Sequence, residues 1–144
     1  MEEKNVVLEL RKMANIMKRT FDNILENKIT TTQSLILNYI YDSNNFGKIV
    51  YQKDIEEFFS IRRSTVCEIL NIMEKNKLIK RNPSKIDLRI KEIKLEINGM
   101  KFINEFKNVT QKLENVLEKD VSLEELKIFF LVLEKFKKNL EDIC

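Results

Sequence analysis

Residues 51–91 decide the fold; they read YQKDIEEFFSIRRSTVCEILNIMEKNKLIKRNPSKIDLRIK. Apolar residues recur at helical spacing over 52–59 and again over 62–75, which predicts two short helices. Between them, Ser60 and Ile61 form a tight turn, about as long as the connection in a helix-turn-helix. The first half of the stretch therefore predicts a helix-turn-helix.

The second half predicts a two-stranded ribbon with a basic loop at its tip. Residues 78–81 are strand-like, and residues 90–97 largely alternate apolar with charged side chains. The loop between them, residues 82–89, contains the only proline of the chain, and Asn98-Gly99 is expected to end the second strand. Two strands joined by an exposed basic loop form a wing.

Positive charge is concentrated in the same stretch. Residues 62–91 carry nine Lys and Arg against three acidic residues, a net charge of +6, whereas the whole chain carries +3. The remaining residues therefore sum to −3. A basic segment within a mildly acidic chain is typical of a protein that binds nucleic acid with one face.

Upstream of the stretch, the sequence predicts two helices and a short strand. Apolar positions at helical spacing indicate a long helix over 5–27. A capping box of Thr30 and Gln33 opens a second helix, expected to end near residue 42. Residues 48–50 are apolar enough for a small strand.

Downstream, the pattern predicts two further helices. One is expected over 100–118, and a capping box of Ser122 and Glu125 opens the last helix, which runs to about residue 142. The first and last helices carry more apolar residues than one small winged body can cover. The fold class is therefore mainly α with a small β wing, with apolar surface left uncovered on the helices at both ends.

Composition excludes several classes of protein. A chain of 144 residues with 43% hydrophobic and 34% charged residues fits one globular domain. The N-terminus is acidic and amphipathic, unlike a signal peptide, and the longest apolar run, residues 128–133, is too short to span a bilayer. We expect a cytoplasmic protein with no membrane partner.

Enzymatic chemistry has little support in the sequence. The chain has no histidine, no glycine-rich phosphate loop and no nucleophile paired with a base. Its two cysteines, Cys67 and Cys144, lie far apart and form no metal or disulfide motif. We expect no catalytic activity, no cofactor and no metal site.

The chemistry that remains is recognition of DNA. The N-terminal residues of a helix lying in the major groove reach base edges, and Arg62, Arg63, Ser64 and Thr65 occupy that position in the second helix. Glu68 and Asn71 follow on later turns and are expected to face the groove. The neighbouring basic residues, namely Lys75, Lys77, Lys80 and Arg81, are expected to be solvated or to face phosphates.

The wing supplies a second predicted contact. Lys85 and Arg89 lie at or beside its tip, where they suit a minor groove or its phosphates. Asp87 precedes Arg89 by two residues, so its carboxylate lies on the same side of an extended strand and can orient the guanidinium.

These motifs together resemble the MarR family of winged-helix transcriptional regulators. The residues that carry the resemblance are Ile29-Thr30-x-x-Gln33, Gln52-Lys53-Asp54-Ile55, Arg63-Ser64-Thr65-Val66, Leu70-x-x-Met73-Glu74-Lys75-Asn76-Lys77-Leu78-Ile79-x-Arg81, Asp87-x-Arg89 and Ile93-x-Leu95-x-x-x-Gly99. With Gln52 from the second motif, the predicted DNA-binding set is Gln52, Arg62, Arg63, Ser64, Thr65, Glu68, Asn71, Lys85, Asp87 and Arg89.

The resemblance implies a single MarR-like domain that binds duplex DNA as a homodimer. Residues 5–27 and 100–142 would form the dimerisation region, and residues 30–97 the winged helix-turn-helix. It further implies a pseudo-palindromic operator, repression, and release by a small aromatic molecule or an oxidant. The alternative is a winged-helix module that binds another protein and not DNA, which the +6 segment disfavours.

Cys67 admits two readings. The favoured one is a small, partly buried side chain beside the inward-facing Val66. The other is a redox sensor, in which Arg62 and Arg63 favour the thiolate and oxidation disrupts DNA contact.

Overall fold

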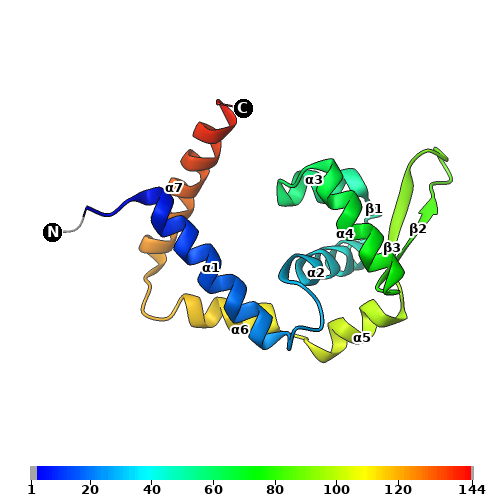
Figure 1. The fold of residues 1–144 in the computed structure, drawn as a ribbon, viewed down its shortest axis with the longest axis horizontal. Helices are drawn as coiled ribbons and strands as arrows, with labels where there is room; N and C mark the ends of the chain where they lie inside the picture. The colour runs from blue at the N-terminus through cyan, green and yellow to red at the C-terminus, as the bar shows by residue number, and fades with distance from the viewer. Residues whose placement is uncertain (1–2, 144) are drawn as a thin grey trace. The chain divides into compact units, whose positions relative to one another are not determined.

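The computed structural model describes residues 3–143, and the chain divides into two compact units at Lys107 and Asn108 (Figure 1). The first unit contains α1 (Val6–Ile24), α2 (Thr31–Asn45), α3 (Gln52–Phe59), α4 (Arg63–Lys75) and α5 (Ile97–Glu105), with strands β1 (Val50–Tyr51), β2 (Ile79–Pro83) and β3 (Lys91–Leu95). The second unit contains α6 (Val109–Leu117) and α7 (Leu123–Glu141). Over the described residues the predicted fold class, mainly helical with a small β wing, is confirmed.

Local hydrogen bonds start the helices where the sequence predicts. The Thr30 hydroxyl accepts from the Gln33 amide and the Gln33 side chain accepts from the Thr30 amide, both at 3.2 Å. Ser122 and Glu125 make the same reciprocal pair at 3.1 and 2.9 Å. These hydrogen bonds satisfy amides that the first helical turn leaves without a partner.

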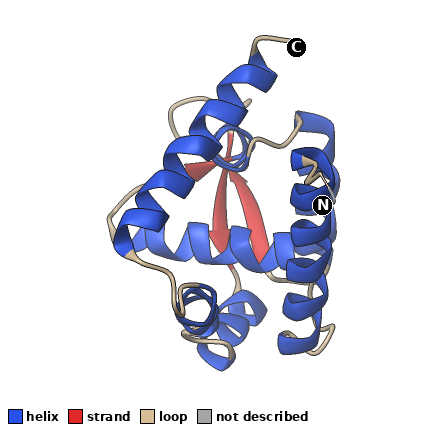
Figure 2. Cartoon of the chain, turned by 90° about the vertical axis from the view of Figure 1, so that its left-hand side faces the viewer, coloured by secondary structure: helices blue, strands red, loops and turns tan. Residues whose placement is uncertain are grey.

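The sheet is antiparallel, with the strand order β1-β3-β2. Ile93 at its centre pairs with Val50 on one side and Arg81 on the other. Figure 2 shows the two longer strands side by side in red. Because β2 and β3 are joined by one loop, they project as the predicted wing.

The core of the first unit lies between the sheet and its helices. Its fully buried side chains come from the end of α1, from α2, α3 and α4, and from all three strands: Leu25, Ile36, Leu37, Ile40, Ile55, Val66, Leu70, Met73, Val50, Ile79 and Ile93. This core fixes α4 against the wing, so the two predicted DNA-contacting elements belong to one packed body.

The predicted helix over 100–118 is wrong, because two helices occupy that range. α5 ends at Glu105, α6 begins at Val109, and Asn108 between them has a positive φ of 69°. Asparagine tolerates this left-handed conformation better than most residues. Apolar residues continue at helical spacing across the break, which explains why periodicity did not reveal it.

The predicted role of Gly99 is also wrong. The strand ends at Leu95 and α5 already begins at Ile97, so Gly99 lies within the helix. A Cβ atom added there would lie 2.2 Å from the Leu78 carbonyl oxygen. Glycine therefore allows close approach of two backbones rather than ending a strand.

Several predicted boundaries shift by a few residues. α2 continues to Asn45 rather than 42, and the first strand lies at Val50–Tyr51 rather than at 48–50. β2 extends through Pro83, whose partner in the register is Lys91. The wing loop therefore begins at Ser84 and is shorter than the sequence suggested.

Candidate nucleic-acid interface

The exposed side of α4 carries most of the predicted DNA-contacting residues. Its inner side buries Val66, Leu70 and Met73. Ser64, Glu68 and Asn71 follow at spacings of four and three residues, so they share the opposite, solvent-facing side. Arg62, Arg63 and Thr65 are also exposed, at the N-terminal end of the helix.

The wing loop is closed by short-range hydrogen bonds. The Ser84 amide donates to the Ile90 carbonyl at 2.7 Å, and the buried Ser84 hydroxyl accepts from the Ile86 amide at 3.2 Å. The Ile90 amide donates to the Asp87 carbonyl at 3.1 Å. These bonds hold the tip in one conformation while Lys85, Ile86 and Leu88 remain exposed.

The predicted contact between Asp87 and Arg89 is present. The Arg89 side chain donates from Nε to Oδ1 at 3.2 Å and from Nη2 to Oδ2 at 3.1 Å. This hydrogen bonding lowers the pKa of the Asp87 carboxyl below its ordinary value. The Arg89 side chain is 90% exposed, so the carboxylate sets its direction without removing it from solvent.

A groove of about 790 Å³ lies between the start of α3, the start of α4 and the wing. Gln52, Arg63, Asp87 and Arg89 from the predicted set line it. The other six predicted residues lie outside the lining: Arg62, Ser64, Thr65, Glu68, Asn71 and Lys85. The structure therefore gathers side chains from three separate elements around one concave surface. Its lining is basic on balance, with five Lys and Arg against three acidic residues: Lys53, Arg63, Arg81, Arg89 and Lys91 against Asp54, Glu56 and Asp87.

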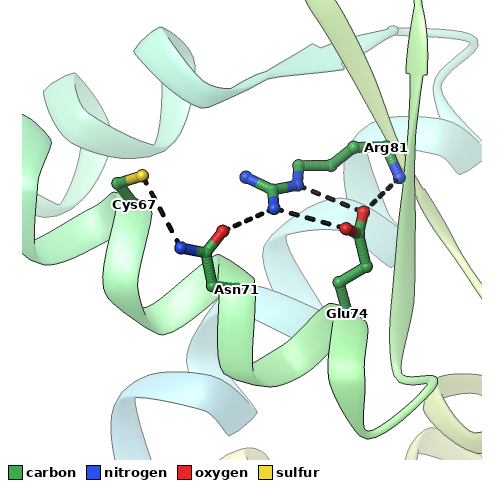
Figure 3. A network of polar contacts seen from close by, with 4 residues as sticks. All are labelled: Cys67, Asn71, Glu74 and Arg81. Atoms are coloured by element: carbon green, nitrogen blue, oxygen red, sulfur yellow. Dashed lines mark hydrogen bonds and ion pairs between the residues drawn. The ribbon is translucent and has the colours of Figure 1, made fainter.

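The sequence did not predict the structural role of Arg81 at this surface. It was expected to be solvated or to face phosphates, but its side chain is only 14% exposed and pairs with Glu74 (Figure 3). It also donates from Nη2 to the Asn71 side-chain oxygen at 2.6 Å. The Glu74–Arg81 pair crosses from α4 to β2, so nothing in the local sequence pattern indicated it.

Cys67 is half-buried on α4, as the favoured reading predicted. Its Sγ lies 3.9 Å from the Asn71 Nδ2, a distance at which sulfur is a weak acceptor. The redox role stays a prediction, and Cys144 lies outside the described residues.

Residues 3–143 contain no group of three His, Cys, Asp or Glu side chains suited to a metal ion. None of the described helices is both long enough and apolar enough to cross a membrane.

Comparison with known proteins adds a family and a set of similar folds. The MarR family model matches residues 28–90. The MepR–DNA complex of S. aureus is 29% identical over 95% of this chain and 99% of that chain, with a TM-score of 0.84. S. aureus MepR in its DNA-binding conformation is 28% identical over the same shares, with a TM-score of 0.81.

A third similar structure supports the fold alone. It is the heme sensor protein PefR from Streptococcus agalactiae in complex with heme, 24% identical over 95% of each chain, with a TM-score of 0.64. Among curated proteins, none matches this sequence significantly. The matches confirm the resemblance drawn from the sequence: residues 28–90 match the MarR family model, and the fold over 95% of the chain is similar to that of S. aureus MepR.

Proposed function

We propose that this chain is a DNA-binding transcriptional regulator that acts as a homodimer on a pseudo-palindromic operator. The observation that carries the proposal is the basic groove, which gathers Gln52 of α3, Arg63 of α4 and Arg89 of the wing around one surface. The similarity of the chain, over 95% of its length, to a protein crystallised on DNA supports the same proposal.

The geometry supports a division of roles. The N-terminal half of α4 enters the major groove, where Arg63 can donate to guanine O6 and N7. Ser64 and Thr65 donate to a phosphate or a base edge, and Glu68 and Asn71 follow on the same exposed face. Gln52 at the start of α3 contacts the backbone, and the wing carries Lys85 and Arg89 to the adjacent minor groove.

The terminal helices are proposed to pair two copies. α1 exposes apolar side chains along one face, including Val7, Leu10 and Met13. α7 exposes Phe129, Phe130 and Leu140 on one face at helical spacing. Apolar surface of this extent is typical of a protein–protein interface, and a second copy is the simplest partner for a DNA-binding head that reads a two-fold site.

We therefore assign residues 30–97 to DNA binding and residues 5–27 and 100–142 to dimerisation, within one MarR-like domain. In the stretch that begins at residue 100, Phe102 and Ile103 are buried in the first unit, so α6 and α7 are proposed to carry most of the pairing surface. Repression, with release by a small aromatic molecule or an oxidant, is the regulation that the family resemblance implies.

Selection of genomic DNA by the purified full chain, followed by fluorescence anisotropy on the selected site, tests the proposal. Affinity should fall steeply as salt is raised, because Lys and Arg contacts to phosphates release counterions. Arg89→Ala should weaken binding by about 1–3 kcal/mol per lost contact.

Lys48→Ala is the matched control, since it removes one exposed positive charge outside the groove and should change affinity much less. Failure to select any DNA, or an affinity that does not depend on salt, would contradict DNA binding and favour a module that binds protein.

A further inference from the structure

The side of α4 that faces β2 carries a connected set of polar contacts (Figure 3). Glu74 accepts from Arg81 three times: from the backbone amide at 3.0 Å, from Nε at 3.2 Å and from Nη2 at 3.3 Å. The same Nη2 donates to the Asn71 Oδ1 at 2.6 Å. Glu74 therefore holds the guanidinium in one place, and the guanidinium holds the Asn71 amide.

The chemistry of the guanidinium decides which way the amide points. Arginine only donates hydrogen bonds, so the Asn71 atom that faces Arg81 must be the oxygen. The amino group then points away from Arg81, where its nearest partner is the weak acceptor Cys67 Sγ at 3.9 Å. A freely rotating asparagine would present either group, but this one presents a donor.

Asn71 lies where a donor can be used. It shares the exposed face of α4 with Ser64 and Glu68, opposite the buried Val66, Leu70 and Met73. Asparagine commonly reads adenine with both ends of its side-chain amide. The oxygen accepts from the adenine amino group, and the amide amino group donates to adenine N7. Here the oxygen already accepts from a charged donor, which is a stronger hydrogen bond than a neutral one.

We propose that Arg81 is a positioning residue that presents Asn71 as a hydrogen-bond donor, so that each copy prefers guanine or thymine at one operator position. Guanine O6 and thymine O4 are major-groove acceptors, whereas cytosine and adenine present amino groups at the corresponding positions and adenine accepts only at N7. The inference rests on the proposed function, since it describes how the recognition helix reads one base pair. In this proposal Arg81 of β2, a strand of the wing, orients the base contact that Asn71 of α4 makes.

The test measures affinity for a selected operator and for every single base-pair change in one half-site. Four variants of the full chain are compared with the unaltered protein: Asn71→Ala, Arg81→Met, Arg81→Lys and Lys80→Met. Arg81→Met keeps the aliphatic stem and removes the donors. Lys80→Met removes one charge from the exposed neighbouring position.

Asn71→Ala should abolish a preference of about 5- to 100-fold for guanine or thymine at one position of each half-site. Arg81→Met should reduce the same preference and raise the relative affinity for adenine there, with the other positions unchanged. Arg81→Lys should lie between Arg81→Met and the unaltered chain. Lys80→Met should lower affinity equally for all sites, because a phosphate-facing charge carries no base information.

Two outcomes would overturn the inference while leaving DNA binding intact. In the first, Asn71→Ala keeps the full base preference at every position. In the second, Arg81→Met or Arg81→Lys changes affinity by the same factor at all positions, as a merely structural residue would. If the unaltered chain selects no sequence at all, the proposed function fails and the inference fails with it. Should Arg81→Met not fold, Arg81→Lys and Asn71→Ala still decide the matter.

Discussion

The winged body and the C-terminal helices are built from the same kind of amphipathic helix, yet their apolar faces end in different environments. In α2, Ile36, Leu37 and Ile40 are fully buried. Within α6 and α7, by contrast, no described residue is buried, and Phe129 is 52% exposed. Helical periodicity thus identifies which face of a helix is apolar, but it does not identify what covers that face.

The largest expected effect comes from placing a charge on the uncovered face. Phe129→Glu should prevent dimerisation, because burying an unpaired carboxylate in an interface is costly. Operator affinity should then fall by about 100- to 10,000-fold, the gain that two linked binding sites give over one. Sedimentation velocity and anisotropy measure the two effects.

Ile128→Glu is the control for that prediction. Ile128 is adjacent and similarly exposed, at 61%, but it lies on the other side of Phe129 from Phe130, about 100° around the helix from Phe129 and about 200° from Phe130. The Ile128→Glu variant should leave dimerisation and operator affinity nearly unchanged. Equal loss of the dimer in both variants would argue against a defined interface on α7.

The next largest effect concerns the buried core of the winged body. Ile40→Ala removes a fully buried side chain and should lower the free energy of unfolding by about 2–5 kcal/mol at any protein concentration. Leu140→Ala, on the exposed face of α7, should reduce stability only at concentrations where the dimer forms. Urea unfolding at two protein concentrations separates these results.

A smaller effect is expected where α5 packs against the turn between α4 and β2. Gly99→Ala places a methyl group 2.2 Å from the Leu78 carbonyl oxygen and should cost about 1–3 kcal/mol of unfolding free energy. Gly47→Ala is the control, since it meets no atom within 4 Å and only strains a φ of 73°. Gly99→Ala should therefore lower the thermal unfolding midpoint more than Gly47→Ala does.

The smallest effect concerns the Glu74–Arg81 pair. The hydrogen bonds that the Glu74 carboxylate accepts from Arg81 lower its pKa below the ordinary value of 4.5. The pair therefore stabilises the fold fully above pH 4.5, and this stabilisation is lost as the pH falls through the lowered pKa. The gain should be under about 1 kcal/mol, because the Glu74 side chain is 41% exposed.

Glu74→Gln provides the measurement for that pair. The variant should be slightly less stable than the unaltered chain at pH 7, and the difference should shrink toward zero in acid. A difference that stays constant between pH 7 and pH 3 would mean that the carboxylate charge is not what stabilises the pair.

Sequence reasoning succeeded where the interaction spans only a few residues. The capping boxes at Thr30 and Ser122, and the pairing of Asp87 with Arg89, involve residues two or three positions apart. Apolar periodicity located the inner face of α4 for the same reason, since one helical turn relates its members. The residues of the basic groove could be proposed because helix-turn-helix and wing follow each other directly in the chain.

The tertiary structure alone decided the contacts that depend on how elements dock. Arg81 meets Glu74 and Asn71 across a strand and a helix, seven and ten residues away, because β2 packs against the side of α4. Gly99 meets Leu78 across 21 residues where α5 approaches the backbone before β2. Periodicity and propensity describe one element at a time, so they identified the exposed residues of α4 but not the neighbour that orients Asn71 among them.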